Sequence, residues 1–223
     1  MQGKDLHAFK KEYVLSELGV DAGFGRMLAI VDFGNVNHWF ESDRQDSDNV
    51  LLSENEKLEI NLEGLKSFSD IFTEHTRFYY GHDSQNPNSV RFLTATKGIF
   101  GKSRVFTKPI QKVRHHLKVE EVPNNTRAIF EDKDGIYVQI PKCNFDVEMT
   151  VDAIRLMDQY DTLVLYSGDA DFVSLCRYLR KKGKKIVLIK GGHITSSLRE
   201  ETDKVINAQT IKRHIAQVRI IER

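Results

Sequence analysis

The sequence is sparing in cysteine and proline and contains no long uncharged apolar run. Its two cysteines, Cys143 and Cys176, lie in no CxxC motif, which excludes a disulfide framework and is typical of a reducing compartment. Charged residues run through the first twenty positions, which excludes the apolar core of a signal peptide and a membrane span there. We therefore expect a cytoplasmic protein with no membrane partner.

An excess of charge of one sign is also lacking. Lys and Arg total 33 against 32 Asp and Glu, for a net charge of +1. A global basic field that would attract nucleic acid is therefore excluded, and any such surface must be local. The 223 residues suffice for one large domain, or one domain with an insertion, that buries its own core.

Apolar strands alternate with amphipathic helices along most of the chain. This order predicts a three-layer, Rossmann-like α/β sandwich with a mostly parallel central sheet. Strands are predicted at 27–33, 76–81, 103–110, 162–167 and 185–190, and helices at 61–74, from Pro87 to Gly98, and at 146–159, 171–182 and 196–202.

Three further segments do not belong to this alternation. Leu6, Phe9 and Tyr13 have helical spacing and predict a packing helix at 5–18, while the polar stretch 42–55 is typical of a surface loop. Two alternating runs around Asp134 and Gly135 predict a β-hairpin, inserted at about 110–141. We expect an N-terminal helical extension at 1–25, the main domain at 26–208 and a C-terminal helix at 209–223.

Acidic residues follow two of the predicted parallel strands. Asp32 ends the first strand, Asp169 and Asp171 directly follow strand 162–167, and Asp146 begins a helix. The carboxyl ends of parallel strands meet at one edge of a sheet, where functional clefts form. Because clustered carboxylates repel one another unless a cation offsets their charge, the pattern predicts a site for Mg²⁺ or Mn²⁺.

Each acid taken alone has a simpler interpretation. Aspartate is a common turn former and helix cap, and a capping role competes with metal binding at Asp146. Asp152 is a secondary metal candidate: it shares a helix face with Glu148, and a solvated or charge-paired face competes with metal binding. His115 and His116 are adjacent strand residues that point to opposite faces, so they are not expected to bind one ion.

A protein that binds a phosphate-rich ligand beside an acidic pocket needs basic side chains to hold the phosphate groups. Phe106 and Tyr137 are candidate stacking surfaces for unpaired bases. Lysines on an edge strand also prevent it from pairing with other sheets, and this role explains the basic residues of the segment equally well. The candidate phosphate contacts are Lys108, Lys112, Arg114 and Lys142.

The motifs resemble the NYN domain of the LabA-like family over roughly residues 26–208. The resemblance is carried by DFGNVN at 32–37, FDVEMTVDAI at 145–154, TSSLREETDKVI at 195–206 and, most specifically, SGDADF at 167–172. NYN domains are relatives of PIN-domain nucleases, with an αβα sandwich and a Mg²⁺- or Mn²⁺-dependent ribonuclease site. The resemblance therefore implies RNA as the substrate.

Carried over residue by residue, the resemblance makes Asp32, Asp146 and Asp169 the core metal ligands. Asn35 matches the family's first-loop asparagine and Asp171 its second acid, so that both join the catalytic candidates. Ser167 would shape the turn and contact the substrate. Hydrolysis assisted by metal ions requires no protein nucleophile, in keeping with the absence of a recognisable Ser or Cys nucleophile motif.

Two other functions remain open at this stage. One is an inactive module that keeps the fold and binds RNA or a protein partner without cutting it. A metal-dependent phosphatase is the third alternative, although DFGNVN lacks the second aspartate of a DxD nucleophile motif. Exposed strand edges would also permit a homodimer.

Overall fold

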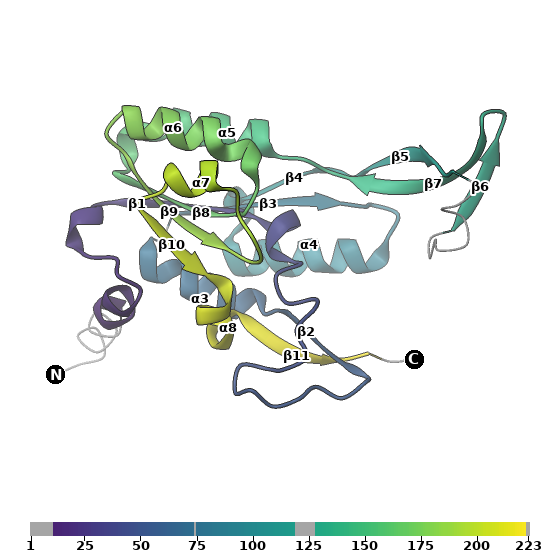
Figure 1. Cartoon of the computed structure of the whole chain (residues 1–223), viewed down its shortest axis with the longest axis horizontal. Helices are drawn as coiled ribbons and strands as arrows, with labels where there is room; N and C mark the ends of the chain where they lie inside the picture. The colour runs from purple at the N-terminus through teal and green to yellow at the C-terminus, as the bar shows by residue number, and fades with distance from the viewer. Residues whose placement is uncertain (1–10, 74, 119–127, 222–223) are drawn as a thin grey trace.

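A six-stranded parallel sheet forms the centre of the computed structural model, which describes residues 11–73, 75–118 and 128–221 (Figure 1). Its strand order is β10-β9-β8-β1-β3-β4, and every pairing within it is parallel. The strands are β1 (Met27–Asp32), β3 (Thr76–His82), β4 (Val105–Pro109), β8 (Thr162–Tyr166), β9 (Lys185–Lys190) and β10 (Lys204–Asn207).

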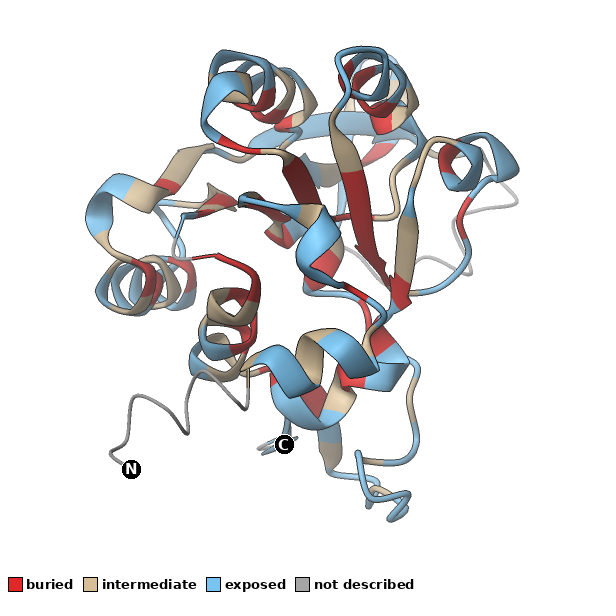
Figure 2. Ribbon diagram, turned by 90° about the vertical axis from the view of Figure 1, so that its left-hand side faces the viewer, coloured by how far each residue is buried: buried red, intermediate tan, exposed pale blue. Residues whose placement is uncertain are grey.

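Helices cover both faces of this sheet. Alternate residues of β1 supply the two cores: Ala29 and Val31 pack on one face, Leu28 and Ile30 on the other. Buried residues accordingly run along the central strands and the inner sides of the helices (Figure 2). This arrangement confirms the predicted three-layer fold. One face carries α3 (Leu62–Phe72), α4 (Pro87–Phe100) and α8 (Ala208–Ile215), and the other carries α5 (Asp146–Arg155), α6 (Val173–Lys181) and α7 (Ser196–Glu200).

Short helical turns complete the connections between these elements. They are α2 (Phe33–Val36) and the 3₁₀ turns η1 (Ala22–Phe24), η2 (Lys102–Arg104), η4 (Met157–Gln159) and η5 (Ala170–Phe172). The helix predicted to end at Gly98 continues to Phe100 and is terminated by Gly101, whose φ of 89° suits glycine. Gly98 is tolerated inside the helix.

The C-terminal segment differs from the expected helix at 209–223. Helix α8 ends at Ile215, and β11 (Ala216–Ile220) then pairs antiparallel with β2 (Glu56–Ile60). The strand partner lies about 160 positions earlier in the chain, beyond the reach of any local pattern. The predicted C-terminal helix is thus wrong beyond residue 215, while the limits of the domains stay a prediction.

The N-terminal helix is described only from residue 11. Residues 11–17 are helical, and Leu6 and Phe9 lie outside the described residues. Tyr13 is 58% exposed, so it does not pack as predicted. The core contacts come instead from Val14, Leu15 and Leu18.

An antiparallel three-stranded sheet projects from the body of the molecule and is called the arm below (Figure 1). It contains β5 (Gln111–His116), β6 (Ile129–Asp132) and β7 (Gly135–Lys142). The predicted hairpin corresponds to β6 and β7, and β5 adds a third strand. None of the described helices is long and apolar enough to cross a membrane.

Candidate metal centre

The candidate acids meet where β1 and β8 end. These neighbouring strands are parallel, with Val31 paired to Tyr166, so their following residues emerge at the same edge of the sheet. The strands β3 and β4 lie on one side of β1, and the later strands β8, β9 and β10 lie on the other. The strand order therefore reverses between β1 and β8. The sequence therefore places Asp32 and the loop after β8 beside each other.

Three carboxylates form a close group at this edge. Asp146, Asp169 and Asp171 each offer an oxygen atom within 4.8 Å of the others. Asp169 caps η5 by accepting a 3.0 Å hydrogen bond from the amide of Asp171. Asp146 is the first residue of α5, and its amide donates to the side chain of Asn144 at 2.7 Å. Because the N-cap position is Phe145, the helix-cap interpretation of Asp146 is wrong.

Asp32 lies next to this group, partly buried. Its carboxylate caps α2 by accepting from the amide of Asn35 at 3.4 Å, and it accepts from the hydroxyl of Ser167 at 3.1 Å. Burial raises the pKa of Asp32 to about 6, against the lowering effect of these two bonds. The charges of Asp146 and Asp169 raise it further, so Asp32 shares an electrostatic field with the group of three.

Burial also raises the pKa of Asp146, opposed by its bond to Asn144 and reinforced by the charges of Asp169 and Asp171. Like-charged groups held this close fit a divalent cation, which would offset their repulsion. The donors are carboxylate oxygens, the ligands that Mg²⁺ and Mn²⁺ prefer. The residues present therefore fit the implied metal, which Asp146, Asp169 and Asp171 could hold, with Asp32 beside them.

Asn35 and Ser167 hold the two acidic loops together. The side-chain oxygen of Asn35 accepts from the indole of Trp39 at 3.0 Å and from the amide of Gly168 at 3.2 Å. Ser167 is fully buried, and its hydroxyl also accepts from the amide of Asp169 at 3.2 Å. Both side chains are therefore placed to position the acids. Sequence reasoning missed the link through Trp39.

Asp152 is not part of the acidic group. It is 8% exposed, and Arg77 and the hydroxyl of Tyr79 contact one of its carboxylate oxygens at 2.7 and 2.5 Å. Arg155 contacts the other oxygen at 2.7 Å. The structure thus favours the charge-paired alternative for Asp152 over metal binding.

Among the basic candidates, Lys108 lies beside the acids. Its ammonium group is 2.8 Å from Glu148 and 4.7 Å from the centre of the Phe145 ring, and its charge lowers the pKa of Asp146. Lys112 and Arg114 lie on the arm, paired with Asp83 at 3.7 Å and Asp132 at 3.0 Å respectively. Lys142 is exposed at the end of β7.

The two candidate stacking rings are already packed. Phe106 lies against Tyr79 and the guanidinium of Arg77, whereas Tyr137 is buried beneath Phe130. The ring that the arm exposes is Phe130, at 41%, and sequence reasoning missed it. The sequence signal that could have found it is the alternation of residues along β6, because neighbouring residues such as Ile129 and Phe130 lie on opposite faces of a strand.

A second group of ligand-type side chains lies on the arm, formed by His116, Asp132 and Asp134. Asp132 is already bonded to His116 at 3.1 Å and to Arg114 at 3.0 Å, and both partners lower its pKa. A cation would have to displace Arg114. The group is therefore explained as an ion-pair network of the arm.

The chain is similar to known proteins in sequence and in fold. A family model described as NYN domain matches residues 46–211. The low amplitude and bright protein LabA of Synechococcus elongatus is 33% identical over 87 residues, which cover 39% of this chain and 47% of the relative. The match thus spans about half the length of that relative.

A solved structure has a similar fold. A protein of unknown function from Vibrio parahaemolyticus superposes with a TM-score of 0.54 at 19% identity, over 82% of this chain and 91% of that one. The matched family segment begins at residue 46 and so omits Asp32 and Asn35. It is their contacts with Ser167 and Gly168 that join these two residues to the acidic edge.

Proposed function

Because this chain belongs to the NYN domain family, we propose that it is a divalent-metal-dependent ribonuclease. The observation that carries the proposal is the group of three carboxylates at the carboxyl edge of the sheet, with partly buried Asp32 beside it. A binding module has no need to hold like charges so close, because their repulsion costs free energy without a cation. Metal-assisted hydrolysis of a phosphodiester does need such ligands.

The roles of the side chains follow from their positions. Asp146, Asp169 and Asp171 bind the cation, and Asp32 adds a fourth negative group whose orientation Ser167 and Asn35 fix. When bound, Mg²⁺ or Mn²⁺ lowers the pKa of water and stabilises charge on the phosphate oxygens. Lys108 holds a phosphate of the RNA beside this centre, and its ion pair with Glu148 keeps the ammonium in place.

Replacing Lys108 with alanine is expected to raise the KM for RNA several-fold with little change in kcat. The lysine contacts a phosphate in both the bound and the transition state, so its loss weakens binding uniformly. A plot of the logarithm of the binding constant against the logarithm of the salt concentration should also become less steep, by about 0.7 for single-stranded RNA. Steady-state kinetics at several salt concentrations would measure both.

Lys181→Ala is the matched control, because Lys181 is an exposed lysine in the last turn of α6. It should leave KM unchanged. An equal effect of the two substitutions would show that Lys108 contributes only to overall charge.

The proposal is tested by incubating labelled single-stranded RNA with the protein in Mn²⁺, in Mg²⁺ and in EDTA. We expect cleavage in either metal and none in EDTA. An Asp169→Asn variant, purified identically, should cut at no metal concentration, which excludes a contaminating nuclease. RNA binding without cleavage by the wild type would overturn the enzyme assignment and identify a recognition module. Release of phosphate from small phosphomonoesters, with RNA left intact, would instead indicate a phosphatase.

A further inference from the structure

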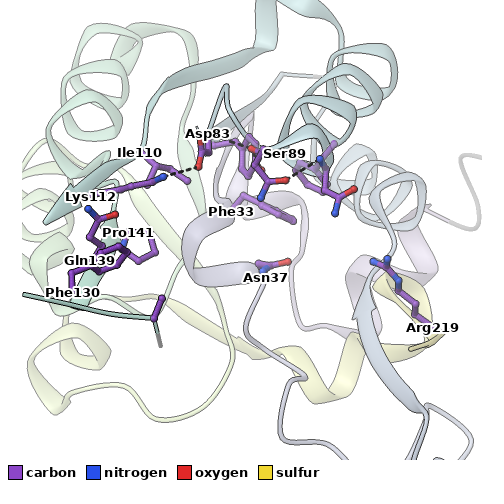
Figure 3. Close-up of a pocket in the computed structure, with 15 residues that line it drawn as sticks. Phe33, Asn37, Asp83, Ser89, Ile110, Lys112, Phe130, Gln139, Pro141 and Arg219 are labelled. Atoms are coloured by element: carbon purple, nitrogen blue, oxygen red, sulfur yellow. Dashed lines mark hydrogen bonds and ion pairs between the residues drawn. The ribbon is translucent and has the colours of Figure 1, made fainter. Parts of the chain in front are cut away.

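A cavity of about 760 Å³ lies beside the acidic edge, between the arm and the start of α4 (Figure 3). Phe33, Tyr80 and Phe92 line it from the body of the protein, and Phe130 and Gln139 line it from the arm. Its volume falls within the roughly 300–1,000 Å³ typical of pockets that enclose a small organic group. The cavity has no role in the mechanism described above.

This cavity adjoins the space beside Asp32. A smaller space of about 290 Å³ is lined by Asp32 and Cys143. The two spaces share wall residues, so a chain whose phosphate reaches Asp32 would pass directly into the larger cavity. The shared residues are Phe33, Asn37, Tyr80, Ile110 and Pro141.

The lining has the chemistry that recognises a nucleobase. Phe92 packs against Phe33 and Tyr80 with ring centroids 4.8 and 4.7 Å apart, which gives an aromatic floor. Aromatic side chains stack on unpaired bases of RNA, and carboxamides match the donors and acceptors of base edges. Asn37 and Gln139 supply such carboxamides on opposite sides of the cavity (Figure 3).

The charges around the cavity indicate which part of a nucleic acid it suits. Both cations of the lining are already paired, Lys112 with Asp83 at 3.7 Å and Arg219 with Glu59 at 3.0 Å, so the charges around the cavity are balanced. An uncharged base complements such a lining better than a phosphate does, so the phosphates of the chain would lie outside the cavity. A duplex keeps its bases stacked and paired, so it cannot place one in the cavity.

We propose that this cavity binds the unpaired base of a nucleotide next to the cleaved phosphodiester, which makes single-stranded RNA the substrate class. The inference rests on the proposed ribonuclease function. Phe130 is the stacking residue that the arm contributes, because its ring is 41% exposed and lines the cavity.

The test measures binding without turnover. In EDTA, a fluorescein-labelled single-stranded oligoribonucleotide is titrated with protein, beside an abasic strand with the same number of phosphates and a duplex of the same sequence. We expect the single strand to bind about tenfold more tightly than the other two. Phe130→Ala should remove most of this difference, in line with the loss of one stacked base.

Ile129→Ala is the matched control, since Ile129 is 47% exposed on the same strand and does not line the cavity. It should bind the single strand like the wild type. Gln139→Leu provides a second variant should Phe130→Ala fold poorly. Equal binding of the abasic strand, or wild-type binding by both cavity variants, would overturn the inference. Cleavage that depends on metal and Asp169 would survive that result, so the two failures are distinguishable.

Discussion

Asp32→Asn is expected to make the metal-free protein more stable while it reduces RNA cleavage about 100-fold. The carboxylate is partly buried beside other acids, and its ionised form costs free energy when no cation is present. Asparagine keeps the shape and still caps α2, but it removes the charge. A loss of about 100-fold is the upper end of the range for residues that support metal ligands.

The raised pKa of Asp32 determines how the stability difference between the variant and the wild type depends on pH. The pKa of Asp32 is about 6 in the folded protein, against about 3.9 for an unperturbed aspartate in the unfolded chain. The folded state therefore binds the extra proton between these values, so wild-type stability falls as pH rises from about 4 through 6. Above pH 7 the full difference, at most about 3 kcal/mol, should separate the variant from the wild type.

Urea unfolding in EDTA at pH 4 and pH 7.5 would measure this difference. The two proteins should have similar stability at the lower pH, and the variant should be more stable at the higher one. Adding Mn²⁺ should stabilise the wild type more than the variant. A variant that is less stable at pH 7.5 would contradict the repulsion on which the metal-site argument depends.

Asp152→Ala is expected to have the opposite outcome, a loss of about 3–5 kcal/mol in the free energy of unfolding with little effect on metal binding. The substitution leaves Arg77 and the hydroxyl of Tyr79 with no carboxylate in a largely buried place. Removing one partner of a buried ion pair is costly because the remaining charge is uncompensated.

Unfolding in urea would measure the stability, and calorimetric titration at low temperature would measure the Kd for Mn²⁺. Asp158→Ala is the control, because Asp158 is an exposed aspartate whose loss should change stability by less than about 0.5 kcal/mol. A Kd for Mn²⁺ at least tenfold weaker in folded Asp152→Ala would restore Asp152 as a metal ligand.

The parallel sheet and the acidic edge were predictable because their signals are local. The run before Asp32 and the run before Asp169 are each apolar enough to mark a buried strand, and parallel strands end at a common edge. The close approach of Asp146 to Asp169 needed the resemblance as well, because helix α5 must pack beside β8 before the two can meet.

The features that were missed depend on distant partners. Strand β11 forms because β2 offers it an antiparallel edge, and no pattern within residues 209–223 contains that information. Asp152 has the residue type of a metal ligand and lies on the same helix as Asp146. Its ion pair with Arg77 from β3 nevertheless holds it outside the acidic group. Phe130 gains importance only because the arm brings it to the cavity that Phe33, Tyr80 and Phe92 also line.

The bonds from Ser167 to Asp32 and from Gly168 to Asn35 join segments 135 and 133 positions apart in the chain. A chain still being made on the ribosome holds Asp32 long before β8 emerges to pair with β1. Until that pairing forms, the acids have no common edge on which to meet. Under the proposed ribonuclease function, the chain would be inert towards the messenger that encodes it until β8 has been synthesised.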